Sequence, residues 1–182
     1  MEGEDRELVE QALAGSKRAF EDLVRRYEKP IYYLALRSVR EEQAAADLAQ
    51  TAFLKAYEGL HGFRGQSSFK TWLYRIAINL CKNYLRDHGK KRFDSLGEMD
   101  PPSTANPLRE LIEHEDQWRI AQAWARLPER QRLAVTLKVQ EGMKYREIAE
   151  VLGCSVGTIK ANFHHACTSL KAMLQEERDE MP

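Results

Sequence analysis

Residues 69–92, FKTWLYRIAINLCKNYLRDHGKKR, place two faces of opposite chemistry on one predicted helix. The apolar face recurs at helical spacing and is expected to be buried; it comprises Leu73, Ile76, Ala77, Leu80 and Tyr84. The other face carries cationic and amide side chains, namely Arg75, Asn79, Lys82, Asn83 and Arg86, with Trp72 at its beginning. No acidic residue occurs between Phe63 and Arg86, although a helix that needs only solubility mixes Glu with Lys.

The segment before this helix, FRGQSSF (63–69), combines a glycine, two serines and flanking phenylalanines. Exposed aromatic rings beside basic groups are what a single-stranded nucleic-acid site requires. Asn is a poor residue for a helix interior, yet Asn79 and Asn83 both lie on the basic face, where their amides can read base edges. These features favour a nucleic-acid site. The alternative for this segment is a basic helix face that is simply exposed to solvent.

The charge distribution divides the chain. The formal net charge is zero, which by itself argues against nucleic-acid binding. However, eight basic residues and one acidic residue lie between His61 and Phe93, and seven acidic residues and one basic residue lie between Asp94 and Trp118. A basic patch is therefore followed by an acidic linker.

The periodic segments are nearly all helical, so we predict an all-α fold with two small domains. Residues 1–93 form an N-terminal helical bundle, 94–107 (DSLGEMDPPSTANP) a flexible linker, and 108–182 a second helical domain. Ser16 is expected to cap a helix that begins at Lys17, and Pro30 to end or kink it. Further helices are expected from there to about Val39 and from near Glu41 to Tyr57, before Gly59 and Gly62 break the pattern.

No apolar run approaches the roughly 20 residues of a membrane span. The N-terminal residues MEGEDRELVEQ lack the basic start and apolar core of a signal peptide, which favours a cytoplasmic protein. Three cysteines, Cys81, Cys154 and Cys167, are too few and too scattered for a disulfide framework.

The helix expected over 42–57 has an inward stripe and a distinct outer face. Ala45, Leu48, Ala49, Ala52, Phe53, Ala56 and Tyr57 are assigned to the stripe. The outer face then carries Asp47, Gln50, Thr51, Leu54 and Lys55. Leu54 among polar neighbours suits a surface that docks a partner, although single exposed leucines are common.

The segment YREIAEVLGCSVGTIKANFHHACTSLK (145–171) predicts a helix-turn-helix. Ile148, Ala149, Val151 and Leu152 give one short apolar face, Gly153 ends that helix and Ser155 caps the next. The second helix turns Val156, Ile159, Phe163, Ala166 and Leu170 inward, and a helix after Pro128 supports the pair. Such a unit places the start of its second helix in the DNA major groove, so the predicted contacts are Ser155, Val156, Thr158, Lys160, Ala161, Asn162, His164 and His165.

In this order the motifs resemble the extracytoplasmic-function (ECF) group of sigma factors in the sigma-70 family. The resemblance covers nearly the whole chain and is carried by DLAQTAFLKAY (47–57), FRGQSSFKTWLYRIAINLCKNYLR (63–86), LPERQRLAV (127–135) and YREIAEVLGCSVGTIKA (145–161). It implies a subunit, not an enzyme in its own right, that binds core RNA polymerase and recognises and melts promoter DNA.

The resemblance also implies residue roles. Asp47, Gln50, Thr51 and Leu54 would bind core polymerase, chiefly its beta-prime subunit with beta beside it, although relatives usually carry Glu where Thr51 stands. Residues of the loop and the basic helix would capture the melted minus-ten strand: Phe63, Arg64, Ser67, Phe69, Trp72, Arg75, Asn79, Lys82, Asn83 and Arg86. Gly65 and Ser68 would add partners for a flipped base, and Lys90, Lys91 and Arg92 would hold phosphates.

The resemblance further implies an anti-sigma partner, and a membrane-anchored one would hold the protein at the inner membrane face. No cofactor, metal or small-molecule substrate is expected. The helix-turn-helix departs from the family pattern, because relatives usually place arginines where Asn162, His165 and Cys167 stand. Fewer cations should weaken phosphate contact and lower its salt dependence.

Three alternatives to a sigma factor follow from other features of the sequence. Cys154, His164, His165 and Cys167 lie close in sequence and suggest a metal or redox sensor. A helix-turn-helix regulator acting without polymerase would leave the basic aromatic helix without a purpose. An enzyme is disfavoured, because the chain has no glycine-rich phosphate loop and no credible pair of nucleophile and base.

Overall fold

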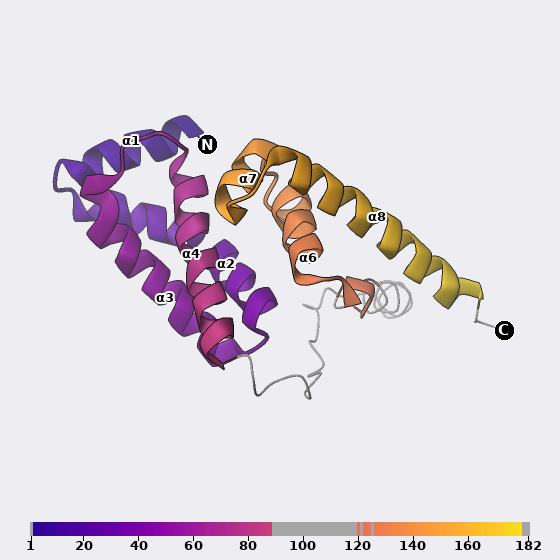
Figure 1. Ribbon diagram of the computed structural model, residues 1–182. Coiled ribbons are helices and arrows are strands. Elements are labelled where there is room, and N and C mark those ends of the chain that lie inside the picture. The colour runs from indigo at the N-terminus through magenta and orange to yellow at the C-terminus, as the bar shows by residue number, and fades with distance from the viewer. Residues whose placement is uncertain (1, 89–119, 121, 125, 180–182) are drawn as a thin grey trace, which may run out of the picture. The chain divides into compact units, whose positions relative to one another are not determined.

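The computed structural model describes residues 2–88, 120, 122–124 and 126–179, and every element in these ranges is helical, which confirms the predicted all-α class. The predicted linker, 94–107, and the expected helical segment 108–119 lie outside the described residues. The chain forms two compact units, of which α1–α4 make up the larger part of the first, while α6, η2 and α8 belong to the second. Figure 1 labels the helices of both.

The first unit begins with α1 (Glu2–Leu13), a helix that the sequence patterns above did not predict. A turn with Gly15 at a φ of 98° leads to α2 (Lys17–Val39). Ser16 caps α2 as expected, since its hydroxyl oxygen accepts a hydrogen bond from the Ala19 amide at 3.3 Å.

Of the two predicted effects of Pro30, an end or a kink, the end was wrong, because α2 continues through it to Val39. Proline removes one backbone hydrogen bond and crowds the preceding turn, which costs about 3 kcal/mol in a helix interior. Here Leu23, Ile31 and Leu34 are fully buried on both sides of Pro30. Packing of this long apolar face against α3 and α4 outweighs the local penalty.

Helix α3 (Glu42–Gly59) approaches its neighbours closely because Ala45, Ala49, Ala52 and Ala56 are buried along one face. Two details differ from the sequence interpretation. Tyr57, assigned to the core, is 50% exposed and packs edge-on against Phe20. Gly59 does not break the helix but is its last residue, and the 3-10 turn η1 (Leu60–Gly62) follows.

Helix α4 (Phe69–His88) is the predicted two-faced helix. Its buried face is shifted by about one residue from the expected stripe, because Ile76 and Leu80 are only half-buried while Tyr74, Ile78 and Cys81 are buried. The reason is that α4 packs against both α2 and α3, so a wider arc of its surface is covered. The predicted polar face remains on the outside.

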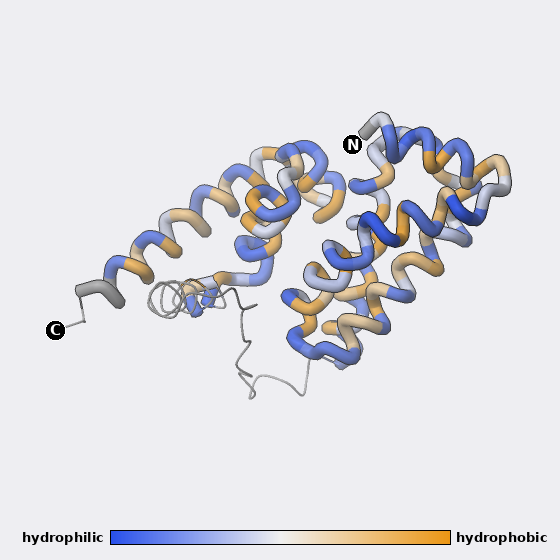
Figure 2. The backbone as a smooth tube through the Cα atoms, turned by 180° about the vertical axis from the view of Figure 1, so that it is seen from behind, coloured by the Kyte–Doolittle hydropathy of each residue, from blue (hydrophilic) through white to orange (hydrophobic). Residues whose placement is uncertain are grey.

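The second unit is built on the packing of α6 (Glu129–Val135) against α8 (Val156–Asp179). The supporting helix begins after Pro128, as the sequence predicted, with Pro128 as the N-cap of α6. Helix α6 continues into the π-helical turn η2 (Thr136–Gln140). The shared core contains Leu127, Val135 and Ala166, with Trp124, Phe163 and Leu170 packed against it. Figure 2 shows hydrophilic and hydrophobic residues alternating along α8, as expected for a helix with one covered face.

The helix-turn-helix is present as predicted. Helix α7 (Tyr145–Leu152) ends at Gly153, whose φ of 67° suits a residue without a Cβ. Ser155 caps α8, since its hydroxyl oxygen accepts a hydrogen bond from the Thr158 amide at 3.0 Å. The Tyr145 ring packs against Phe163 of α8 and lies under the Lys138 ammonium group of η2.

One inward assignment in α8 was wrong. Val156 is 37% exposed, whereas Ile159 and Ala166 are buried and Phe163 and Leu170 are half-buried. Val156 is the first residue of the helix, where the chain has just emerged from the turn. None of the helices in the described ranges has the length and apolar character that a membrane span requires.

Candidate nucleic-acid interface

The loop between η1 and α4 is fixed at both ends by hydrogen bonds. At its start, the Phe63 amide donates to the Leu60 carbonyl at 3.0 Å. At its end, the Ser68 hydroxyl oxygen accepts from the Thr71 amide at 3.1 Å, which caps α4. Ser68, which the sequence interpretation offered to a flipped base, is thus engaged in holding the helix. Gly65 between them has a φ of 66°, a conformation that other residues rarely adopt.

This loop and the first turns of α4 line a small, partly open polar cavity of about 110 Å³. Five residues predicted from sequence line it together: Phe63, Arg64, Ser67, Trp72 and Arg75. Gly62 and Gln66 also line it and were not predicted. The position of Gln66 between Gly65 and Ser67 in the loop is the signal that would have suggested it.

Phe69, also predicted to contact DNA, is only 3% exposed and is therefore not available as a stacking surface. Its ring lies behind the cavity, 5.9 Å from Trp72 and 6.3 Å from Phe63 between ring centroids, and 5.9 Å from Tyr27 of α2. Phe63 and Trp72 are only half-buried, with centroids 5.0 Å apart. Phe69 thus supports the two aromatic rings that face the cavity.

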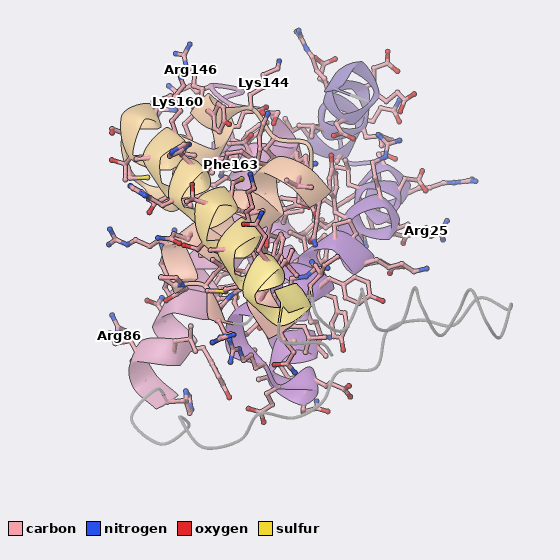
Figure 3. The ribbon with its side chains drawn as sticks, turned by 90° about the vertical axis from the view of Figure 1, so that its right-hand side faces the viewer. Arg25, Arg86, Lys144, Arg146, Lys160 and Phe163 are labelled. Carbon is pink, nitrogen blue, oxygen red and sulfur yellow. The ribbon has the colours of Figure 1, made fainter. Side chains whose placement is uncertain are left out.

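The outer face of α4 continues from Arg75 at the cavity and presents the other predicted groups. Arg75, Asn79, Lys82, Asn83 and Arg86 are all exposed. Arg86 pairs with the neighbouring Asp87 at 3.0 Å, so part of its charge is neutralised, and it extends from α4 in Figure 3. Lys90, Lys91 and Arg92 lie outside the described residues. The face is cationic and rich in amides, as expected for a surface that follows a nucleic-acid strand.

On α3, the predicted docking residues form an outer face of mixed character. Asp47, Gln50 and Leu54 are exposed, Leu54 to 58%. Thr51 is half-buried, and its hydroxyl donates to the Asp47 carbonyl of its own helix at 2.7 Å. Beside this face lies an apolar groove of about 480 Å³ between α2 and α3, lined mainly by Phe20, Val24, Tyr32, Phe53, Leu54 and Tyr57.

In the helix-turn-helix, the outward residues of α8 lie largely where the sequence placed them. Ser155, Thr158, Lys160, Ala161, His164 and His165 are exposed, and Asn162 is half-buried. The Ser155 and Thr158 hydroxyl groups are hydrogen-bonded to each other at 2.9 Å. Lys144 and Arg146, exposed cations at the start of α7, were missed; Figure 3 shows them extending outward.

The sulfur and imidazole groups of this region are spread out. Cys154 is half-buried in the turn, Cys167 is exposed on α8, and the His164 and His165 ring centroids are 6.1 Å apart. Among the described residues, no cluster of three or more His, Cys, Asp or Glu side chains is arranged to hold a metal ion.

The two halves of the chain match two families. Residues 23–91 match the family described as Sigma-70 region 2, and residues 117–170 match Sigma-70, region 4. Solved structures are similar as well. CnrH, in complex with the cytosolic domain of CnrY, has a TM-score of 0.71 at 28% identity, covering 95% of this chain and 98% of that one. RpoE of Bartonella quintana, in complex with the anti-sigma factor NepR, has a TM-score of 0.67 at 26% identity. The match covers 86% of this chain and 96% of that one.

Relatives match over almost their full length. The RNA polymerase sigma-H factor of Pseudomonas aeruginosa is 40% identical over 182 residues, covering 94% of both chains. The ECF RNA polymerase sigma-E factor of Escherichia coli K12 is 36% identical over 183 residues, again covering 94% of both. With its two matched regions and this full-length similarity, the chain belongs to the ECF group of the sigma-70 family, the sigma factors that direct RNA polymerase to promoters.

Proposed function

We propose that the two halves of this sigma factor divide the promoter between them. Helices α1–α4, in the predicted domain 1–93, dock on core polymerase and hold the melted minus-ten strand. The domain predicted over 108–182 binds the minus-thirty-five element as duplex. The observation that carries the proposal is the polar cavity beside the exposed basic face of α4.

The cavity has the groups that a flipped base requires. Extruding a base costs a few kcal/mol, which stacking and edge hydrogen bonds must offset. Phe63 and Trp72 offer ring surface, where stacking contributes about 1–3 kcal/mol per base. Gln66 and Ser67 offer amide and hydroxyl partners, and Arg64 brings positive charge.

The strand on either side of that base would follow the outer face of α4. Arg75, Lys82 and Arg86 would contact phosphates, and Asn79 and Asn83 lie between them along the helix. We therefore propose that the cations contact phosphates and that the amides read bases. Phe69 supports the site from within the core.

For core polymerase, the outer face of α3 is the docking surface that we propose. Leu54 is an exposed apolar residue flanked by Asp47 and Gln50, and the adjoining groove adds an apolar surface. An apolar centre with a polar rim is the usual anatomy of a protein interface. The partners would be the beta-prime and beta subunits.

The helix-turn-helix would place the start of α8 in the major groove. Lys160 is an exposed cation in the second turn of α8, Lys144 is an exposed cation of the same unit, and the first-turn amides of α8 add a partial positive charge. Because the cations are few, we expect modest phosphate binding. Joining this weak contact to the minus-ten contact raises the effective concentration of each half at the promoter.

We also propose regulation by an anti-sigma factor, which is supported by the similarity to Bartonella quintana RpoE, solved with the anti-sigma factor NepR. CnrH, solved with the cytosolic domain of CnrY, is likewise similar. The protein would act in the cytoplasm, or at the inner membrane face when that partner is anchored there. Catalysis would belong entirely to the polymerase. A regulator acting without polymerase is not favoured, because it would not use the α3 face or the cavity.

The test is run-off transcription with purified bacterial core polymerase on fragmented genomic DNA of the host. Discrete start sites that require this chain are expected, and aligning them gives both promoter elements. A parallel assay compares holoenzyme binding to duplex and to a template already melted around the minus-ten element. Start sites that are the same with and without the chain would refute the proposal. It would also be refuted if the free chain bound promoter DNA as tightly without core polymerase as the holoenzyme does.

A further inference from the structure

The end of α3 makes close contact with the cavity wall. A Cβ atom added at Gly59 would lie 3.3 Å from Trp72 Cζ2 and 3.6 Å from Trp72 Cη2. The first distance is shorter than an ordinary van der Waals contact between carbon atoms. Any side chain at position 59 therefore requires the indole of Trp72 to move.

The backbone gives no reason for glycine at this position. Gly59 has φ of −84° and ψ of −4°, in the right-handed region that other residues adopt freely. Gly65, by contrast, needs its positive φ of 66°. Glycine is also a weaker helix residue than alanine. The feature that favours glycine at position 59 is the close approach of the Trp72 indole.

The direction in which Trp72 would move follows from its surroundings. Phe63 lies 5.0 Å and Phe69 5.9 Å from Trp72 between ring centroids, and the buried Phe69 is itself packed against Tyr27. Trp72 also lines the polar cavity, where there is open space. Displacing the indole away from Gly59 would therefore push it toward the cavity.

We infer that Gly59 is a positioning residue for promoter-strand capture, because it seats Trp72 at the back of the cavity and so sets the space left for a flipped base. The inference rests on the proposed function, since it assigns that cavity to a melted strand. Gly59 acts only through Trp72 and does not itself contact the strand.

The variants are graded by size. Gly59→Ala demands a shift of Trp72 by a few tenths of an ångström, and Gly59→Leu demands more. Gly3→Ala is the matched control, because it also adds a methyl group to a helical glycine but its Cβ meets nothing within 4 Å. Each holoenzyme is measured for affinity to a promoter template melted around the minus-ten element, for core binding and for thermal unfolding of the sigma factor.

We expect roughly threefold weaker binding of the melted template for Gly59→Ala and roughly tenfold for Gly59→Leu, fractions of a full stacking contribution. Core binding should be unchanged, and Gly59→Ala should be at least as heat-stable as the parent. Gly3→Ala should bind the template normally. In a Trp72→Phe background, Gly59→Ala should have no further effect, because the smaller ring leaves room for the methyl group.

Wild-type affinity for the melted template in folded Gly59→Leu would overturn the inference. If Gly59→Leu does not fold, an unchanged affinity in Gly59→Ala overturns it instead. The inference would also be overturned if Gly59→Ala weakened template binding as much in the Trp72→Phe background as in the parent. The effect would then come from α3 and not from Trp72. Failure of the wild-type holoenzyme to initiate anywhere is a different outcome, because it refutes the proposed function itself.

Discussion

Removing the Asp5 carboxylate should detach α1 from the first unit. Asp5 is 5% exposed, and both its oxygens are engaged: Oδ1 accepts from Arg26 Nη1 at 2.6 Å, and Oδ2 accepts from the Tyr27 hydroxyl. Burial alone would lower the pKa of Arg26, but its hydrogen bond to Asp5 and the charges of Asp5 and Glu4 raise it. The contribution of Arg26 is therefore retained at neutral pH and is lost as the pH rises above the ordinary pKa of arginine.

The size of the effect follows from this geometry. A hydrogen bond to a charged group contributes about 1.5–3 kcal/mol net, and Asp5→Ala removes two. The Arg26 side chain is 34% exposed, so solvent recovers part of the loss, and we expect a cost of about 2–4 kcal/mol. Helix α1 has 12 residues and is marginal by itself, so the loss should appear as local release of α1.

Hydrogen exchange by mass spectrometry is the assay. Protection of the α1 amides should fall by about 30-fold to 700-fold in Asp5→Ala, while α4 stays protected. Asp22→Ala is the matched control: Asp22 pairs with Arg25 at 3.6 Å on the surface, and Figure 3 shows Arg25 extending into solvent. Equal, small effects of the two variants would refute the argument that burial of Asp5 makes its contacts important.

Three further predictions concern the proposed contacts. Gln50→Ala combined with Leu54→Ala should weaken core binding about tenfold or more in a competition assay, without lowering the thermal stability of the free protein; normal core binding would contradict the α3 assignment. Asn79→Ala should change the choice of start sites on a promoter library more than it changes core affinity, and an unchanged start-site profile would remove Asn79 from base reading. Lys160→Ala should reduce the salt dependence of duplex binding by about one unit of slope with little change in sequence preference, and an unchanged slope would argue against a phosphate contact.

Signals that act over a few residues could be read from the sequence correctly. Ser16, Pro128, Gly153 and Ser155 mark helix ends in the structure as they do in the sequence, because capping involves only the neighbouring turn. The outer face of α4 was likewise predictable. Helical periodicity alone separates the polar residues that begin with Arg75 and end with Arg86 from the apolar side of the helix.

Properties that depend on distant segments were not predictable in this way. Helix α2 passes through Pro30 because its apolar face packs against α3 and α4, and Tyr57 is half exposed at the groove between α2 and α3. The sequence also did not distinguish Phe69, which is buried, from Trp72, which lines the cavity. All of these depend on which partner a side chain meets across the core.

The sequence by itself therefore determined the all-helical fold, the helix-turn-helix and the family, because caps, periodicity and motif order are written in consecutive residues. Only the tertiary structure decided the shape of the cavity, the seating of Trp72 against Gly59 and the attachment of α1 through Asp5. Each of these contacts joins different helices. Their geometry follows from how the helices pack, which local preferences do not specify.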